Sequence, residues 1–148
     1  LACNIQPEGK LTVVSASLQA TMSLSGNENI DIIQLGGMLR HSSASVVGQY
    51  SMEFLRGCSF SKLFLGVDGI DVDFGISTTD IREAELNRAM MQAAQKTIVL
   101  ADSSKFGRRG FAKISGMEDI DTIITDAKIP HAVAKRIEEM GIDLIIAG

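Results

Sequence analysis

The 148 residues carry a formal net charge of -4 and a pI of about 5.1, with 45% hydrophobic and 22% charged residues. This composition is ordinary for a globular domain and argues against disorder. An acidic chain with 5% aromatic residues and no Trp is a poor candidate for binding DNA through its own surface. The cysteines, Cys3 and Cys58, show neither metal-binding nor disulfide spacing, and no apolar run approaches the roughly 18 residues of a membrane span. We therefore expect one soluble, cytoplasmic domain.

The first part of the chain alternates between strand and helix patterns. Residues 1–9 resemble the last turn of a helix followed by a Pro-Glu-Gly stop, and the chain begins with Leu, so we expect a fragment of a longer polypeptide. The elements predicted next are a strand at 11–15, a helix capped by Ser17 and ended by Gly26, a strand at 30–35, a serine-rich loop at 41–48 and a short helix at 50–57.

The second part continues this alternation. The predicted elements are strands at 60–67, 97–101, 120–125 and 142–147, a helix at 80–96 and a helix at 130–140 that begins at Pro130 and ends before Gly141. Strands separated by helices with short connections favour parallel pairing. The predicted fold class is therefore α/β, with a mostly parallel sheet covered by helices on both faces.

Acidic residues follow the predicted strand at 60–67. Asp68 and Asp71 come directly after this apolar run, in a turn that contains Gly69. Carboxylates at the end of such a strand can accept hydrogen bonds from sugar hydroxyls or act as a general base. Glu83, at the start of the next helix, is a further candidate. The alternatives are that Asp68 caps the turn and that Glu83 closes a capping box with Thr79 or Asp80.

Two further segments have the composition of anion sites. Gly36 and Gly37 follow a predicted strand and can present backbone N–H groups, while Arg40 can hold a phosphate with two hydrogen bonds. The second segment, DSSKFGRR at 102–109, combines hydroxyls, amides and cations, with Lys105 as the expected direct contact. The alternatives are an ordinary strand-to-helix turn with a solvated arginine and a solvated basic loop.

Other chemistries lack a signature. His41 and His131 have no partner at metal-binding spacing, and the chain contains no Gly-x-Ser-x-Gly elbow, Walker loop or dinucleotide fingerprint. We expect no metal, no cofactor and no catalytic residue. Acids that can bind hydroxyls and cations that can bind a phosphate together predict a small, polyhydroxylated, anionic ligand.

The chain closely resembles the C-terminal effector domain of DeoR-type bacterial transcriptional regulators over nearly its whole length. The motifs that carry the resemblance, in order, are LGGMLR (35–40), VG (47–48), LGVDGID (65–71), GIST (75–78), EA (83–84), NRAM (87–90), ADSSKFG (101–107) and IDTIITD (120–126). The resemblance implies a domain that senses a phosphorylated sugar and relays this to an N-terminal winged helix-turn-helix. It also implies a fold similar to ribose-5-phosphate isomerase and glucosamine-6-phosphate deaminase.

The resemblance places its ligand-binding residues on matching positions of this chain. These are Gly36, Gly37, Arg40, Asp68, Gly69, Asp71, Glu83 and Lys105. Glu83 matches the carboxylate base of the isomerase-like relatives and, in a regulator, is expected to bind a sugar hydroxyl. The chain departs from the family pattern because it lacks the DNA-reading domain, the first strand and its Gly-Thr-Thr phosphate loop. Residues 15–17 also lack an Asn that is common there.

Three functions are compatible with these residues. The first is a ligand-sensing domain of a repressor, without enzymatic activity, whose partners are a phosphorylated sugar, DNA through the absent N-terminal domain, and further copies of itself. The second is a sugar-phosphate isomerase or amino-sugar-phosphate deaminase of the same fold. The third is an assembly domain with a vestigial pocket. For the homo-oligomer we expect the helix at 48–56 to provide a contact surface, and we expect no membrane partner.

Overall fold

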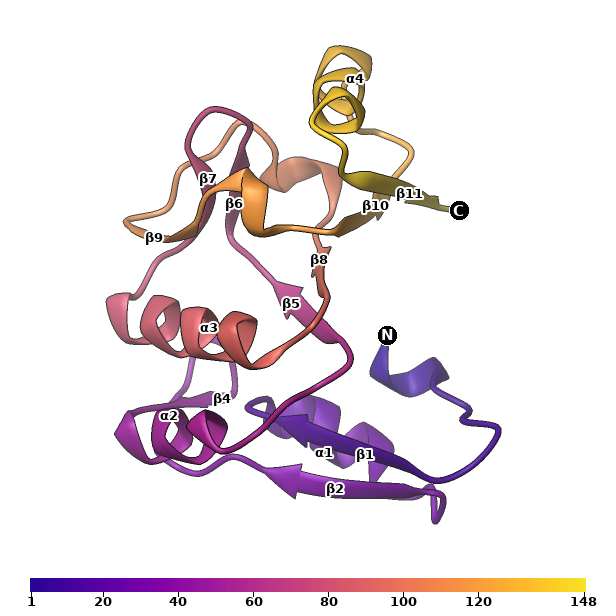
Figure 1. Cartoon of the computed structure of the whole chain (residues 1–148), viewed down its shortest axis with the longest axis vertical. Coiled ribbons are helices and arrows are strands. Elements are labelled where there is room, and N and C mark those ends of the chain that lie inside the picture. The colour runs from indigo at the N-terminus through magenta and orange to yellow at the C-terminus, as the bar shows by residue number, and fades with distance from the viewer. The chain divides into compact units, whose positions relative to one another are not determined.

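A computed structural model describes all residues, 1–148, and the chain forms two compact units, residues 1–54 and 55–148. Each unit is described by itself. The elements of the first unit are the 3-10 helix η1 (Ala2–Asn4), β1 (Leu11–Ser15), α1 (Leu18–Leu24), β2 (Ile30–Gln34), β3 (Met38–Arg40), β4 (Ser45–Val47) and most of α2 (Gln49–Arg56) (Figure 1). The connection between α2 and the next strand belongs to the second unit.

The first unit contains a parallel pair of strands and a separate hairpin. β1 and β2 run side by side, with Val13 opposite Ile32, and α1 connects them. As predicted, Ser17 caps α1, because its side chain accepts a hydrogen bond from the backbone N–H of Ala20. β3 and β4 pair antiparallel, with Leu39 opposite Val46. The prediction of a continuous loop at 41–48 is therefore wrong for β4, where the buried side chains of Val46 and Val47 favour strand pairing over an open serine-rich loop.

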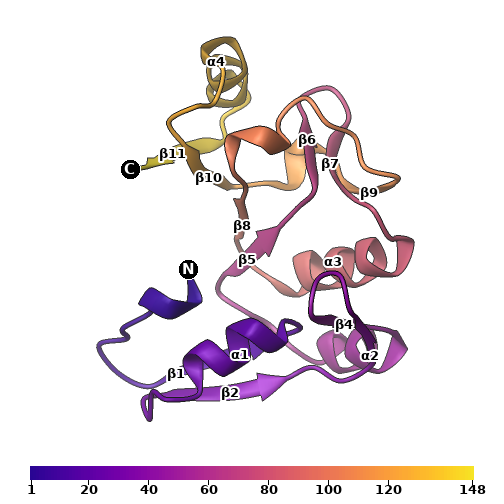
Figure 2. The same ribbon diagram turned by 180° about the vertical axis from the view of Figure 1, so that it is seen from behind.

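The second unit contains two sheets. Its elements are β5 (Leu63–Gly66), β6 (Gly69–Asp71), β7 (Gly75–Thr78), α3 (Ile81–Ala93), β8 (Thr97–Leu100), η2 (Ser103–Lys105), β9 (Ala112–Ser115), η3 (Met117–Asp119), β10 (Thr122–Asp126), α4 (His131–Glu139) and β11 (Asp143–Ala147). Four parallel strands lie in the order β11-β10-β8-β5, and three antiparallel strands lie in the order β6-β7-β9 (Figure 2).

The parallel sheet confirms the predicted α/β class. Its strands are short apolar runs, and the register places Leu65 opposite Val99, which in turn lies opposite Ile123. The antiparallel sheet was not predicted. The strand predicted at 60–67 ends at Gly66, and the segment that looked like one turn before a helix forms β6 and β7. These strands have only three and four residues, too few to show a clear alternation of polar and apolar side chains.

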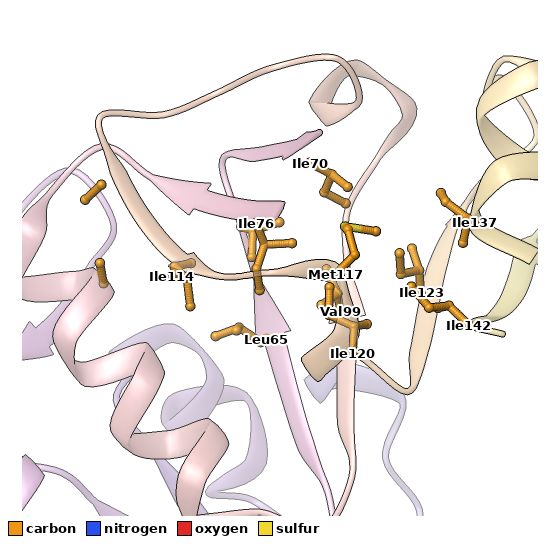
Figure 3. Packing of buried hydrophobic residues seen from close by; sticks show 13 residues of the cluster. Leu65, Ile70, Ile76, Val99, Ile114, Met117, Ile120, Ile123, Ile137 and Ile142 are labelled. Atoms are coloured by element: carbon orange, nitrogen blue, oxygen red, sulfur yellow. The ribbon is translucent and has the colours of Figure 1, made fainter. Parts of the chain in front are cut away.

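The core of the second unit collects side chains from both sheets. Figure 3 shows Leu65 and Val99 from the parallel sheet beside Ile76 of β7 and Ile114 of β9, with Met117 near them. Val99 and Ile76 are fully buried. This cluster anchors β5 and β8 as neighbours, so the segments that leave their carboxyl ends are held next to each other. None of the helices combines the length and the apolar composition that a membrane span requires.

Candidate functional site

A cavity of about 490 Å³ lies where β5 and β8 end. The residues that line it follow or terminate these two strands, apart from one on α3 and one on η2: Gly66, Val67, Asp68, Glu83, Leu100, Ala101, Asp102 and Lys105. β5 and β8 are adjacent and parallel, with Gly66 opposite Leu100. Open α/β sheets bind their ligands at the carboxyl ends of the strands. The cavity therefore occupies the position at which a ligand site is expected, and it brings together three predicted residues, Asp68, Glu83 and Lys105.

Asp68 reaches the cavity from the first residues after β5. Its Oδ2 atom accepts hydrogen bonds from Thr78 Oγ1 at 2.8 Å and from the backbone N–H of Thr79 at 3.3 Å. The Asp68 backbone N–H donates to the Ser77 carbonyl at 3.0 Å. The end of β7 therefore holds both the backbone and one carboxylate oxygen, while Oδ1 accepts neither of these side-chain hydrogen bonds. A carboxylate held in this way can accept a hydrogen bond from a hydroxyl group without losing side-chain freedom on binding.

Glu83 reaches the cavity from the first turn of α3. The N-terminal cap of this helix is Asp80, which accepts hydrogen bonds from the backbone N–H groups of Arg82 at 2.8 Å and Glu83 at 3.3 Å. Arg82 also donates two guanidinium hydrogen bonds to Asp80, which hold the pKa of that carboxyl well below its ordinary value. The backbone of Glu83 thus takes part in the cap, while its half-buried side chain lines the cavity. Asp80 is thus the cap residue, and the prediction that the Glu83 side chain closes a capping box stays a prediction.

Lys105 ends the short helix η2, which follows β8. Asp102 caps this turn, accepting hydrogen bonds from the backbone N–H of Ser104 at 2.9 Å and from the Ser104 hydroxyl, and the hydroxyl is the main reason why the pKa of Asp102 is lowered. The backbone N–H of Ser103 donates to Asp126 Oδ2 at 2.8 Å. Because both N–H groups at the start of the turn already bind carboxylates, the amides expected to help hold an anion are occupied. Lys105 is the cation that the turn presents to the cavity.

The charges around the cavity favour a hydroxylated ligand with a single anionic group. Asp68, Glu83 and Asp102 contribute carboxylates, and Lys105 contributes the ammonium group. A phosphate beside the carboxylates would be repelled, whereas a phosphate beside Lys105 would be attracted. Carboxylate oxygens accept hydrogen bonds from hydroxyl groups. The cavity therefore combines carboxylates that can accept hydrogen bonds from hydroxyl groups with one cation, Lys105, that can attract an anion and lies near Asp102.

Gly69 and Asp71 lie in the β6–β7 hairpin and are absent from the lining of this cavity. The Asp71 carboxylate accepts hydrogen bonds from the backbone N–H groups of Asp73 and Phe74, both at 2.9 Å, and from the Arg109 guanidinium. The Arg109 side chain is the main reason why the pKa of Asp71 is lowered. At Gly69, a Cβ atom would lie 2.5 Å from the Arg108 carbonyl oxygen. Both residues therefore have packing or turn-forming roles that the motif alone did not reveal.

The remaining predicted residues, Gly36, Gly37 and Arg40, belong to the first unit. They lead into the β3–β4 hairpin, not into a helix. Gly37 has a φ of +148°, and a Cβ atom there would lie 2.3 Å from the Val47 carbonyl oxygen, so this position requires glycine for the close approach of the two strands. Arg40 ends β3, where its guanidinium donates to Ser42 Oγ at 3.3 Å. Their role at a ligand stays a prediction.

The sequence reasoning missed three residues that shape the cavity. Asp102 lines it, Thr78 holds Asp68, and Asp126 holds the turn that carries Lys105. Asp102 and Asp126 both follow apolar runs that were predicted as strands, so the rule applied to Asp68 would also have identified them. Thr78 had no such signal, because its contact depends on the pairing of β6 and β7. No group of three or more His, Cys, Asp or Glu side chains in the chain is arranged to hold a metal ion.

Comparisons with known proteins agree on one family. A family model described as "DeoR C terminal sensor domain" matches residues 1–127. The HTH-type transcriptional regulator YulB of Bacillus subtilis is 36% identical over 135 residues, covering 91% of this chain and 52% of that protein. The HTH-type transcriptional regulator GlpR of Haloferax volcanii is 30% identical over 145 residues, covering 98% and 56%. The glycerol-3-phosphate regulon repressor of Haemophilus influenzae is 27% identical over 137 residues, covering 93% and 53%.

The chain spans about half the length of the curated relatives it matches. These relatives are named as transcriptional regulators or a repressor, and the matching family is one of sensor domains. The resemblance drawn from the sequence motifs is therefore confirmed, as is the prediction of a regulator family in place of an enzyme family.

Proposed function

Because the chain belongs to the family of DeoR C-terminal sensor domains, we propose that it binds a phosphorylated sugar and thereby controls the DNA binding of a full-length transcriptional repressor. Residues 1–148 act as the effector domain in this proposal. DNA is contacted by a helix-turn-helix part of the full-length protein, and the regulator works as a homo-oligomer. The names of the relatives, which include HTH-type regulators and a glycerol-3-phosphate regulon repressor, support this assignment.

The observation that supports the proposal most directly is that one cavity is lined by the carboxylates of Asp68 and Glu83 and by the ammonium group of Lys105. Lys105 forms an ion pair with the phosphate, and Asp68 Oδ1 and the Glu83 carboxylate accept hydrogen bonds from sugar hydroxyls. Gly36, Gly37 and Arg40, which belong to the first unit, stay predicted ligand-binding residues. Gly69 and Asp71 support the site through the hairpin that follows Asp68 and do not contact the ligand.

A thermal-shift panel tests the proposal. Each phosphorylated sugar is compared at equal concentration with its unphosphorylated parent and with inorganic phosphate, because a sensor that uses both the carboxylates and Lys105 should be stabilised more by the phosphorylated sugar than by either component alone. A ligand at 100 times its dissociation constant should stabilise the protein by about 2.7 kcal/mol. If parent sugars stabilise the protein as much as their phosphates do, the proposed phosphate contact at Lys105 is wrong. If no sugar phosphate has any effect, the sensor function itself is overturned.

A further inference from the structure

We propose that Asp126 is a positioning residue for Lys105. Its carboxylate holds the turn that carries Lys105 and, with its other oxygen, the turn that leads to α4. Ligand binding at Lys105 therefore changes the geometry at the start of α4. This inference rests on the proposed function of the cavity, but it concerns a residue that does not line the cavity and lies on a different strand.

The two hydrogen bonds of Asp126 run in different directions along the chain. Oδ2 accepts from the backbone N–H of Ser103 at 2.8 Å, and Oδ1 accepts from the backbone N–H of Lys128 at 2.8 Å. Both distances are typical of strong bonds to a charged acceptor. Asp126 is half-buried, and these N–H bonds are the main reason why its pKa is lowered. A single carboxylate thus joins two loops that are far apart in sequence.

The position of Asp126 in the sheet explains why it reaches the Lys105 turn. β10 pairs in parallel with β8, and the Ala101 backbone N–H donates to the Ile124 carbonyl at 3.2 Å, one residue beyond the last strand pair. Asp126 follows two residues later, level with the start of η2. At the other end of the turn, the Gly107 N–H donates to the Ile70 carbonyl at 2.8 Å. The turn that carries Lys105 is therefore anchored at both ends, and Asp126 is the side chain that anchors its start.

The second bond connects this turn to α4. Beyond Lys128, the Ile129 N–H donates to the Asp126 carbonyl at 3.4 Å, and Pro130 is the N-terminal cap residue of α4. A displacement of Ser103 changes the position of the Asp126 carboxylate, and through it the geometry at the Lys128 N–H.

The matched control for Asp126 is Asp121, at the opposite end of the same strand region. Asp121 Oδ2 accepts from the backbone N–H of Thr97, also at 2.8 Å. Both Asp126→Asn and Asp121→Asn therefore replace a carboxylate that accepts a hydrogen bond from a backbone N–H. Asp126→Asn does so at the carboxyl end of the sheet, and Asp121→Asn does so at its amino end. In the Asn side chain only one atom can accept, so Asp126→Asn retains at most one of the two bonds.

The experiment follows the amide signals of the ¹⁵N-labelled protein during a titration with inorganic phosphate. In the wild type, the amide signals of Lys105 and Lys128 are expected to change their chemical shifts with one common dissociation constant. The chemical shift of the Thr97 amide signal should not change. Asp126→Asn is expected to weaken phosphate binding about tenfold, which corresponds to the loss of one charge-assisted hydrogen bond. Asp121→Asn should bind as the wild type does. Amide hydrogen exchange without phosphate should show faster exchange at Ser103 or Lys128 only in Asp126→Asn.

The outcomes separate the two claims. If wild-type protein binds phosphate and Asp126→Asn binds it equally well, Asp126 does not position Lys105 and the inference is overturned. The same holds if the Lys128 amide fails to respond in the wild type, a result that needs no variant to fold. If the wild-type Lys105 amide does not respond to phosphate and the thermal-shift panel also shows no response to sugar phosphates, the proposed sensor function fails together with the inference.

Discussion

The Arg109 guanidinium donates to both carboxylate oxygens of Asp71, from Nε to Oδ2 at 2.9 Å and from Nη2 to Oδ1 at 3.3 Å. The same guanidinium lies 5.1 Å from the centre of the Phe74 ring, at the tip of the β6–β7 hairpin. Asp71, which was predicted to bind a ligand, therefore pairs with an arginine of the predicted basic loop. The two aspartates that follow β5 therefore have different positions: Asp68 lines the cavity, and Asp71 belongs to the β6–β7 hairpin.

Replacing Asp71 should lower stability more than it lowers ligand affinity. Asp71→Ala removes the acceptor for two backbone N–H groups and for Arg109, and we expect a loss of about 1 to 3 kcal/mol in the free energy of unfolding. Urea unfolding measures this loss. Asp73→Ala is the control, because the Asp73–Arg136 pair is exposed to solvent and contributes less. A large loss of sugar-phosphate binding in folded Asp71→Ala would instead return Asp71 to the site.

Lys105→Ala should weaken the binding of phosphorylated sugars by about tenfold or more, because it removes the cation that lines the cavity. Arg108→Ala is the matched control, since Arg108 is an exposed cation three residues further along the same loop and does not line the cavity. Isothermal titration calorimetry can compare the two variants. Equal losses of affinity in both would indicate a diffuse electrostatic attraction in place of a specific contact.

Two glycines of the second unit, Gly66 at the end of β5 and Gly75 at the start of β7, should respond differently to alanine. At Gly75, with a φ of +116°, a Cβ atom would lie 2.0 Å from the Ser115 carbonyl oxygen, so we expect Gly75→Ala to cost more than about 2 kcal/mol in the free energy of unfolding. At Gly66, nothing lies within 4 Å of a Cβ atom, yet the residue lines the cavity. Gly66→Ala should therefore fold normally and bind the ligand less well. If Gly66→Ala instead lowers stability and leaves ligand affinity unchanged, the cavity is not the binding site.

Stability should decrease under acidic conditions through several aspartates. The pKa values of Asp71, Asp102 and Asp126 are lowered from 3.8 by hydrogen bonds from Arg109, from Ser104 and from the Ser103 backbone, respectively. As the pH falls, a carboxyl group whose pKa is lower in the folded state takes up its proton first in the unfolded state. Its contribution to the free energy of unfolding is therefore complete above its unfolded pKa of 3.8. The contribution is lost as the pH falls through the pKa of the folded state.

The urea midpoint measured as a function of pH tests this expectation. It should be nearly constant from pH ~7 to pH ~5 and should fall below pH ~4. In Asp71→Ala the fall should be shallower, because one of the contributing carboxylates is absent. A midpoint that stays constant into the acidic range would show that these hydrogen bonds do not contribute to stability in solution.

The parallel sheet was predictable because its strands are uninterrupted apolar runs bounded by polar loops. Val99 and Ile123, for example, lie within β-branched segments that have no other stable position than a buried strand. The β6–β7 and β3–β4 hairpins were not predictable in the same way. Their strands have three or four residues each, and they are stabilised by partners distant in sequence, as when Ser77 of β7 lies opposite Lys113 of β9.

For the candidate site, local sequence patterns were enough to predict which segments end at the carboxyl edge of the sheet, and with them Asp68 and Lys105. The order of the motifs was enough to identify the family. Three contacts could be seen only in the folded chain: Glu83 reaches the same cavity from α3, Arg109 binds Asp71, and Asp126 holds the Lys105 turn. The physical reason is that a carboxylate's partner depends on which backbone N–H or cation the fold brings within about 3 Å, and that distance is not encoded in local sequence.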